Sequence, residues 1–445
     1  MSPASSRPGR ACIIGAGSSG IIAAQVLDAA GVPFDCFEMG SEVGGNWRYD
    51  NDNGVSSAYR SLHINTSRQA MEYAAYPMPE SLPDYPSHWQ IAAYFDDFVD
   101  HFGLREKITF RTEVVKVAPA DGGGYDVTVR RIGKRSEPET RHYEHVLVAN
   151  GHHWDPRWPE PSFPGAETFP GVQQHAHYYR TPDELAGKRV VVLGIGNSAT
   201  DIAVESSRVA KETYLAMRRG AHIVPKFMFG MPTDHLTDSP LARGPLFLQK
   251  LGMAAMLRIA QGRVTDYGLP EPDHKVLEAH PTVSDDLLTR LGHGDITVKP
   301  NIDRFEGSKV FFTDGSAVEA DVVVYCTGYK VSFPFLGDDV VHAEDNHVDL
   351  YRRVVSPDHP GLYFIGLIQP IGAVMPLAEE QAHWVAEVLT GRVELPPPAE
   401  MRAQIASYDE ALRKRYVASK RHTIQVDAHK YRAELRRERK EHARR

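Results

Sequence analysis

The sequence predicts an α/β protein with two doubly wound nucleotide-binding domains. Two glycine-rich turns, at residues 15–20 (GAGSSG) and 194–199 (GIGNSA), each follow a short apolar run and open a segment of helical character. A strand, a glycine turn and a helix in this order form the phosphate-binding unit of Rossmann-like folds. Because glycine lacks a side chain, the backbone can approach a pyrophosphate, and the helix N-terminus stabilises its charge. The candidate phosphate-binding residues are Gly15, Gly17, Ser19 and Gly20 in the first turn, and Gly194, Gly196, Asn197 and Ser198 in the second.

The residue that ends the strand after each turn differs in charge between the two halves. The strand at 34–37 (FDCF) is followed by Glu38, whereas a similar count from the second turn reaches Arg218 and Arg219. A carboxylate accepts a hydrogen bond from a ribose 2′-hydroxyl and repels a 2′-phosphate, whereas guanidinium groups pair with that phosphate. The first site therefore suits the ADP half of FAD or NAD, and the second suits NADP. We expect such a chain to move a hydride from NADPH to a flavin.

The two halves also repeat each other further along the chain. Residues 144–151 (EHVLVANG) and 321–328 (DVVVYCTG) both read as an acid, a buried strand, a small residue and a glycine. Each is preceded by an alternating pattern typical of an antiparallel ribbon, at 125–129 and at 310–312, and Asp314-Gly315 predicts a hairpin turn. The sequence therefore predicts duplication of one nucleotide-binding unit.

Domain boundaries follow from this repeat. We expect an FAD-binding domain with its first part at 1–167, an NADPH-binding domain at 168–330, and the second part of the FAD-binding domain, with C-terminal helices, at 331–445. The FAD-binding domain is therefore discontinuous. A stretch rich in proline and aromatic residues, 152–171, is predicted to connect the halves. The basic end of 401–445 is expected to be a solvated helix or a frayed tail.

Composition excludes several classes of function. With 445 residues and a net charge of -8, the chain has no basic excess that would favour nucleic acid. Its three cysteines include no CxxC pair, so we expect buried thiols and a cytoplasmic protein. No apolar run approaches the roughly 20 residues that cross a bilayer, so no membrane association is expected. No metal site is expected either.

The stretch between the two halves carries the most specific motif. Residues 169–179 (FPGVQQHAHYY) match F-x-G-x-x-x-H-x-x-x-Y at Phe169, Gly171, His175 and Tyr179. With this string between two dinucleotide turns, the chain resembles the flavin-containing monooxygenases, within the class B flavoprotein monooxygenases, as a soluble, bacterial-type member. Tyr179 favours this family over the related Baeyer–Villiger enzymes, which usually carry tryptophan there. We expect His175 to be a packed or hinge residue more often than a catalyst.

Further short segments resemble the family in the same order along the chain. They are 44–47 (GGNW), 150–153 (NGHH), 217–220 (MRRG), 326–329 (CTGY), and 364–370 (FIGLIQP) with Pro376 and 379–381 (EEQ) after it. The resemblance implies cofactor contacts for Gly45, Trp47, Thr327 and Gly328.

One more match concerns the reactive edge of the flavin. Residues 65–68 (NTSR) resemble the family string N-[TS]-S-K. The resemblance implies that the Asn65 amide faces the flavin, that Gln369 lies opposite as a second amide, and that Thr66 contacts the cofactor. Taken alone, an asparagine in a loop is more often a turn or cap residue. In one departure from the family, Ala75 stands where an acid is common, which leaves substrate access open.

The resemblance implies a reaction that needs FAD, NADPH and molecular oxygen. NADPH reduces the flavin, which then holds oxygen as a C4a-hydroperoxide and oxygenates a soft nucleophile, by N-oxidation of an amine or S-oxidation of a sulfide. A Baeyer–Villiger enzyme acting on ketones remains an alternative, as does a non-enzymatic NADPH sensor, although a sensor needs no second dinucleotide. A flavin disulfide reductase would need a CxxC pair. The substrate is not predicted, and a homodimer is compatible with this plan.

Overall fold

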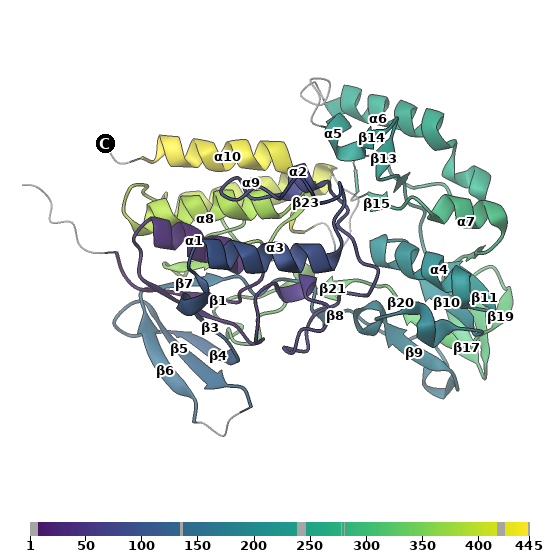
Figure 1. Cartoon of the computed structure of the whole chain (residues 1–445), viewed down its shortest axis with the longest axis horizontal. Coiled ribbons are helices and arrows are strands. Elements are labelled where there is room, and N and C mark those ends of the chain that lie inside the picture. Colours follow the sequence, from purple (N-terminus) through teal and green to yellow (C-terminus); the bar gives the residue numbers. More distant parts are fainter. Residues whose placement is uncertain are drawn as a thin grey trace, which may run out of the picture. The chain divides into compact units, whose positions relative to one another are not determined.

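The computed structural model describes residues 8–133, 137–237, 246–276, 278–279, 281–415 and 423–443 (Figure 1). By its internal contacts the chain divides into two compact units. Unit 1 takes the residues up to 56, residues 68–155 and those from 330 onward, and unit 2 takes 57–67 and 156–329. The predicted connector, 152–171, contains one of these divisions. Unit 2 also includes the short segment 57–67, and the assignment of domain boundaries to the two cofactors stays a prediction.

A five-stranded parallel sheet forms the core of unit 1, in the order β22-β7-β1-β2-β3. Its strands are β1 (Ala11–Ile14), β2 (Phe34–Phe37), β3 (Ile108–Thr109), β7 (His145–Val148) and β22 (Leu362–Phe364). All four residues of β1 are buried, as expected for a parallel strand that is covered on both faces. The helix α1 (Ser18–Ala29) begins directly after the turn that follows β1, and Gly31, in the left-handed region, follows its end.

The rest of unit 1 surrounds this sheet. An antiparallel sheet is formed by β4 (Thr112–Pro119), β5 (Tyr125–Arg131) and β6 (Glu139–Tyr143). The other helices are α2 (Arg68–Met71), α3 (His88–His101), α8 (Met375–Leu389), α9 (Pro398–Arg415) and α10 (Ala428–Glu441). A capping box between Ser87 and Gln90 starts α3. The short strands β23 (Gln369–Ile371) and β24 (Gln425–Asp427) pair with each other.

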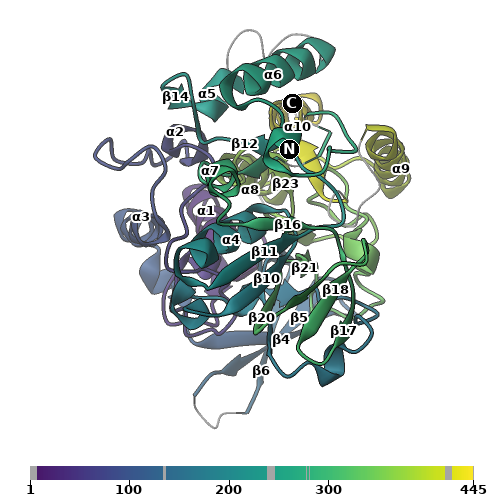
Figure 2. The ribbon, with the colours of Figure 1, turned by 90° about the vertical axis from the view of Figure 1, so that its right-hand side faces the viewer.

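Unit 2 contains a second five-stranded parallel sheet, in the order β16-β11-β10-β20-β9. Its strands are β9 (Val172–His175), β10 (Arg189–Leu193), β11 (Glu212–Ala216), β16 (Thr297–Lys299) and β20 (Val322–Tyr325). Figure 2 shows α4 (Asn197–Val209) lying over β11 and β10, which it contacts. An antiparallel ribbon is formed by β17 (Ile302–Glu306), β18 (Lys309–Phe312) and β19 (Ala317–Glu319). The strands β12 (Ile223–Val224), β13 (Phe227–Met228), β14 (Met231–Pro232) and β15 (Thr282–Val283) and the helices α5 (Thr233–Thr237), α6 (Leu246–Gln261) and α7 (Leu287–His293) lie between β11 and β16 in the chain.

The predicted duplication is confirmed in the strand order. In unit 1, β1 has β7 and then β22 on one side, and β2 and then β3 on the other. In unit 2, β10 takes the place of β1, with β20 and then β9 on one side, and β11 and then β16 on the other. The acids that precede the repeated strands also act alike. Glu144 accepts a hydrogen bond from the Arg10 N–H at 2.7 Å, and Asp321 accepts one from the Arg189 N–H at 2.8 Å. In each unit the acid therefore fixes the start of the first strand.

The basic C-terminal segment differs from its prediction as a solvated helix or frayed tail. The helix α10 packs against α8, with Leu435 buried on its inner side. Arg439 pairs with Glu387 at 2.7 Å and with Glu380 at 3.3 Å. The predicted helix is present and Arg437 and Lys440 on it are exposed, but its other side is not solvated, because Arg436 and Arg439 pair with acids of α8, a helix distant in the sequence. Arg444 and Arg445 lie outside the described residues.

Candidate functional site

The two glycine turns begin with the same close approach of backbone segments. Gly15 and Gly194 both have positive φ, at 97° and 138°. A Cβ atom added to Gly15 would lie 2.8 Å from the Ala149 carbonyl oxygen, and one added to Gly194 would lie 2.7 Å from that of Cys326. A side chain is therefore excluded at the same point of both units, where the first strand ends beside its neighbour.

In the first turn, glycines stand at each point where another backbone segment comes close. A Cβ atom at Gly20 would overlap the carbonyl oxygen of Gly15, so only glycine fits there. A Cβ atom at Gly45 would lie 3.1 Å from the Cα of Gly17, and one at Gly366 would overlap the Ser19 side chain. The structure thus brings together three segments, 15–20, 44–47 and 364–370, that the sequence assigned to one FAD site. Their bare backbone forms a cradle that side chains would fill, as a pyrophosphate site requires.

Glu38 lies directly beside this first turn. One carboxylate oxygen accepts the Ala16 N–H at 2.7 Å and the other accepts the Gly40 N–H at 2.8 Å. Only 4% of Glu38 is exposed, and burial raises the pKa of its carboxyl group despite these two hydrogen bonds. Two backbone N–H groups therefore hold the predicted ribose selector at the end of β2. Trp47 ends a short 3-10 helix (Gly45–Trp47), and the Asn51 amide donates to the Gly45 carbonyl at 2.9 Å.

Two polar residues on the buried face of α8 hold the site segments of unit 1. The Glu379 carboxylate accepts the N–H groups of Ala74 and Ala75, at 2.7 and 2.9 Å. The Gln381 side-chain oxygen accepts the Gly366 N–H at 2.8 Å. The sequence identified 379–381 only by resemblance, although an acid and an amide within an otherwise apolar helical stripe are a signal for such a role. At Ala75 the chain lacks the family acid, and Glu379 binds the backbone at that position.

The residues of the second turn and its predicted selectors are less buried than those of the first. Gly196 precedes α4, and the side-chain oxygen of Asn197 accepts the Val283 N–H at 2.8 Å. Ser198 is half-buried, and Arg218 and Arg219 follow β11 with exposed side chains. The Arg219 guanidinium lies 3.4 Å from Asp273. Among the described residues Arg218 makes no ion pair, so its charge is available to a phosphate.

Thr327 and Gly328 follow β20 in unit 2. The Thr327 hydroxyl donates to the Arg157 carbonyl, and the Arg157 N–H donates to the Gly328 carbonyl at 2.9 Å. Both residues therefore fix the chain that enters unit 2, while Gly328 itself is exposed.

The motif between the halves makes packing contacts within unit 2. Phe169, His175 and Tyr179 are buried, and a Cβ atom at Gly171 would lie 2.5 Å from the Asp321 carbonyl oxygen. His175 accepts the His177 N–H at 3.0 Å through Nδ1, and burial lowers the pKa of its imidazole to about 4. The Tyr179 hydroxyl donates to Glu205. These are the contacts of a packed, neutral histidine; a catalytic step for His175 has no support in them.

The segment with Asn65 belongs to unit 2 and is bound there by side chains. The Tyr59 hydroxyl donates to Asp201 of α4, and both the N–H and the hydroxyl of Ser67 donate to Asp234. Asn65 and Thr66 are half-buried between these points. In unit 1, the Gln369 N–H donates to the Ile424 carbonyl at 2.8 Å where β23 starts. That the two amides face each other across a flavin stays a prediction.

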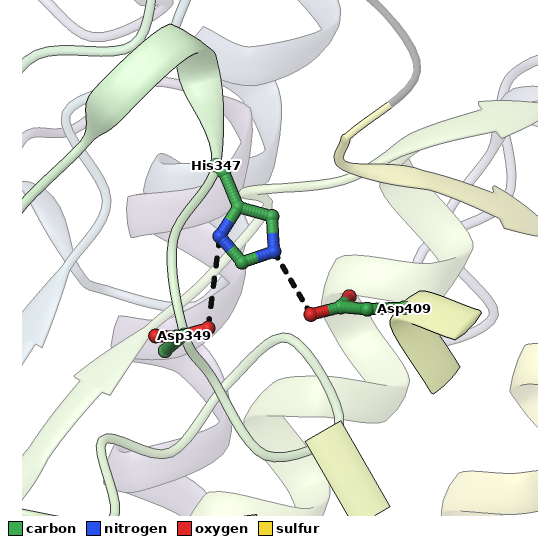
Figure 3. Close-up of side chains that lie close together, drawn as sticks. All are labelled: His347, Asp349 and Asp409. Atoms are coloured by element: carbon green, nitrogen blue, oxygen red, sulfur yellow. Dashed lines mark hydrogen bonds and ion pairs between the residues drawn. The ribbon is translucent and has the colours of Figure 1, made fainter. Parts of the chain in front are cut away.

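A histidine and two aspartates gather at a separate place in unit 1 (Figure 3). His347 directs Nδ1 toward Asp349 at 3.6 Å and Nε2 toward Asp409 at 2.9 Å. The hydrogen bond to Asp409 raises the pKa of His347. Arg353 also pairs with Asp409, at 3.1 Å. Because the two ring nitrogens serve different carboxylates and a guanidinium already neutralises one of them, the group fits an ion-pair network better than a metal site.

The two parallel sheets, each with a glycine turn after its first strand, define the class of proteins with two Rossmann-like domains, and comparison with known proteins gives the family. The family model for flavin-binding monooxygenase-like proteins matches residues 9–440. Flavin-containing monooxygenase 5 of Rattus norvegicus is 40% identical over 435 residues, which is 94% of this chain and 80% of the relative. Dimethylaniline monooxygenase [N-oxide-forming] 2 of the same species is 36% identical over 417 residues, which is 90% and 77%. The chain belongs to the flavin-binding monooxygenase-like family.

Solved structures agree with this assignment. The S-allyl-L-cysteine S-oxygenase from Allium sativum superposes with a TM-score of 0.73 at 27% identity, covering 97% of this chain and 88% of that one. The open structure of cyclohexanone monooxygenase has a TM-score of 0.71 at 17% identity, covering 97% and 98%, and shows the fold alone.

Several predictions from the sequence are thereby confirmed. The protein is an oxidoreductase, a flavin-dependent monooxygenase that acts with molecular oxygen on a small molecule. The non-enzymatic sensor is excluded. In the part of the chain that the structure describes, no helix has the length and apolar character needed to cross a membrane.

Proposed function

We propose that this enzyme oxygenates soft nucleophiles, at the nitrogen of amines or the sulfur of sulfides. The observation that carries this proposal is that two similar proteins are named for oxygenation at a heteroatom. One is the N-oxide-forming dimethylaniline monooxygenase of rat, and the other is the S-allyl-L-cysteine S-oxygenase of Allium sativum. Because one acts at nitrogen and the other at sulfur, the shared property is attack by a soft lone pair.

Residues of this chain would hold the two cofactors in separate units. In unit 1, the first turn with Ser19, Gly45 and Trp47 would bind the FAD pyrophosphate, and Glu38 would accept the ribose hydroxyl. In unit 2, the second turn would bind the NADPH pyrophosphate, and Arg218 and Arg219 would pair with the 2′-phosphate. When bound, FAD supplies oxygen activation and NADPH supplies the hydride. The chain would bind and orient the two cofactors and would exclude water from them.

Two amides would act at the reacting oxygen. The Asn65 side chain would donate a hydrogen bond to it, and Gln369 would provide a second amide. An amide N–H is a very weak acid, so it can hold an oxygen atom without delivering the proton that releases hydrogen peroxide. Asn65 would thus favour transfer of oxygen to the substrate over its loss. Thr66, Thr327 and Gly328 would complete the cofactor contacts.

A substrate screen tests the reaction class. NADPH oxidation is measured with tertiary amines, sulfides and cyclic ketones, with hydrogen peroxide release followed in parallel. We expect N-oxide or sulfoxide formation in proportion to NADPH consumed. Lactone or ester formation from the ketones alone would instead establish the Baeyer–Villiger alternative.

The substitution Asn65→Leu tests the role of the amide. We expect FAD content and NADPH-driven flavin reduction to stay near the parent values, while oxygenation falls and hydrogen peroxide released per NADPH rises. Gln69→Leu is a matched control, since it removes an exposed amide four residues away. If Asn65 were only a loop cap, the variant would lose about 1 kcal/mol of stability and remain coupled.

Two broader properties stay proposals. A cytoplasmic location is supported by the three cysteines, which are all free thiols, as is usual in a reducing compartment. A homodimer is tested by sedimentation velocity on the purified holoenzyme.

A further inference from the structure

The segment 57–67 is bound to unit 2 near both of its ends. Near its start, the buried Tyr59 donates its hydroxyl to Asp201, and the Arg60 N–H donates to the Arg180 carbonyl at 2.9 Å. At its end, Ser67 is bound to Asp234. Ile64, between them, is fully buried. The segment is therefore an ordered strap, held by acids that lie far from it in the sequence.

The end nearer to Asn65 is attached through Ser67. Ser67 is fully buried, and its N–H and its hydroxyl both donate to one oxygen of Asp234, each at 2.7 Å. His235 Nε2 lies 3.2 Å from the same hydroxyl. Two hydrogen bonds to one carboxylate are charge-assisted and fix both the backbone and the side chain of Ser67. Since residues two apart are separated by at most about 7 Å, this attachment limits where the Asn65 backbone can lie.

We infer that Asp234 is a positioning residue for the Asn65 amide, acting through Ser67. The inference rests on the proposed oxygenation chemistry, in which Asn65 supports the reacting oxygen. Asp234 lies in the first turn of α5, in the part of unit 2 between β11 and β16. Asn65 is therefore held by the unit that carries the second glycine turn. Loosening Ser67 should let the amide leave its position while both nucleotide sites stay intact.

Variants at either partner test this inference. Asp234→Ala and Ser67→Ala each remove one half of the attachment, and Asp234→Asn keeps an acceptor oxygen of the same shape. Asp286→Asn is the matched control, because Asp286 forms an exposed ion pair with Arg208 elsewhere in unit 2. The holoenzymes are compared by FAD content and NADPH-driven flavin reduction, which show that each variant is folded and reducible.

Two measurements are then made on each variant. Amide hydrogen exchange reports how well the strap 57–67 is held, and hydrogen bonds to charged groups predict roughly tenfold faster exchange there in Asp234→Ala. The second measurement is coupling with a saturating substrate. When coupling fails, NADPH, O₂ and H⁺ give NADP⁺ and H₂O₂ with no product. We expect a several-fold rise in H₂O₂ per NADPH for Asp234→Ala and Ser67→Ala, partial rescue in Asp234→Asn, and no change in Asp286→Asn.

The outcomes separate this inference from the proposed function. The inference would be overturned if amide exchange in 57–67 were unchanged in Asp234→Ala. It would also be overturned if exchange there became faster while oxygenation stayed fully coupled to NADPH oxidation, provided that Asn65→Leu is uncoupled. Faster exchange with loss of coupling, repaired by Asp234→Asn, supports it. Failure of the proposed function appears elsewhere, as a parent enzyme that oxygenates neither amines nor sulfides. Full coupling in Asn65→Leu would overturn the inference together with the role of the amide.

Discussion

The two glycine turns share their first half and differ in how they close. Gly15 and Gly194 stand at equivalent positions, each too close to a neighbouring strand end for a side chain. Five residues later, the first turn has Gly20 and the second turn has Ala199 at the corresponding position. A Cβ atom at Gly20 would overlap the Gly15 carbonyl, whereas the second turn accommodates the methyl group of Ala199. The first turn is therefore the tighter of two versions of one design, and a single methyl group distinguishes them.

The helices that follow the turns differ in the same direction. Counting from the first glycine of each turn, Ile22 and Val26 of α1 correspond to Asp201 and Glu205 of α4. In unit 1 these positions are apolar and buried. In unit 2 the two acids accept hydrogen bonds from Tyr59 and Tyr179. The second copy of the helix has thus become an attachment point for the strap with Asn65 and for the motif between the halves.

The largest effect is expected at the closing residue of the first turn. Gly20→Ala should destabilise unit 1 by roughly 1–3 kcal/mol and abolish FAD binding, because the methyl group displaces the Gly15 backbone. Flavin absorbance and thermal unfolding measure both effects. Ala199→Gly is the control in the second turn and should cost only about 0.5–1 kcal/mol. Equal losses in the two variants would show that the turns do not differ as described.

Gly17→Val separates flavin binding from folding. A Cβ atom at Gly17 would meet only the Gly45 backbone, at 3.6 Å, so the chain itself has room for it. The valine methyl groups would instead occupy the cradle, and we expect a folded protein that lacks FAD. Circular dichroism and flavin content are measured, with Gly122→Val in an exposed turn of unit 1 as the control. Full flavin content in Gly17→Val would remove the first turn from the FAD site.

A smaller and more selective effect is expected at the arginines that are predicted to bind the 2′-phosphate in unit 2. Arg218→Ala should raise KM for NADPH far more than for NADH, because a charge-assisted phosphate contact contributes roughly 1.5–3 kcal/mol. Arg219→Ala should change the ratio less, since Arg219 is already close to Asp273. The ratio of kcat/KM for the two nucleotides is the measurement. If both cofactors suffered equally, Arg218 would not bind the 2′-phosphate.

The smallest effect is expected at Asp201 of α4, which stands at the position that the apolar Ile22 has in α1. Burial raises the pKa of Asp201 to about 6 from 3.8, although the Tyr59 hydroxyl stabilises the charged form. The folded state then holds the proton more tightly, so this group lowers stability as pH rises from about 4 to 6 and has a constant effect above. Asp201→Asn cannot titrate, so its Tm relative to the parent should increase across that window.

The hydroxyl of Tyr59 provides the control for this titration. Tyr59→Phe removes the donor that stabilises the charged carboxylate, so the pKa of Asp201 should rise further and the sloping region should extend above pH 6. Thermal unfolding of the parent and the two variants is followed across pH 4–8. Parallel curves for the parent and Asp201→Asn would contradict the raised pKa.

The sequence by itself determined the two nucleotide-binding units and their order. The glycines at 15, 20 and 194 could be predicted because the backbone passes there through a space that has no room for a side chain, and glycine is the residue type without one. Glu38 could be predicted from its place alone, because the residue that would select the ribose follows the strand after the turn. The acids Glu144 and Asp321 were visible as a repeat, and the structure shows what they bind.

Only the tertiary structure decided how distant polar groups pair. Ser67 and Asp234 are 167 residues apart, and Ala74 and Glu379 are 305 apart. Nothing local to Asp234 distinguishes it from the other acids of the chain, and the apolar surroundings of Glu379 do not say what it binds, because a carboxylate can accept from any donor that packing places within reach. The docking of α10 on α8 through Arg439 has the same origin. Backbone geometry is specified by residue type at a position, whereas side-chain pairing depends on which segments the packed core brings together.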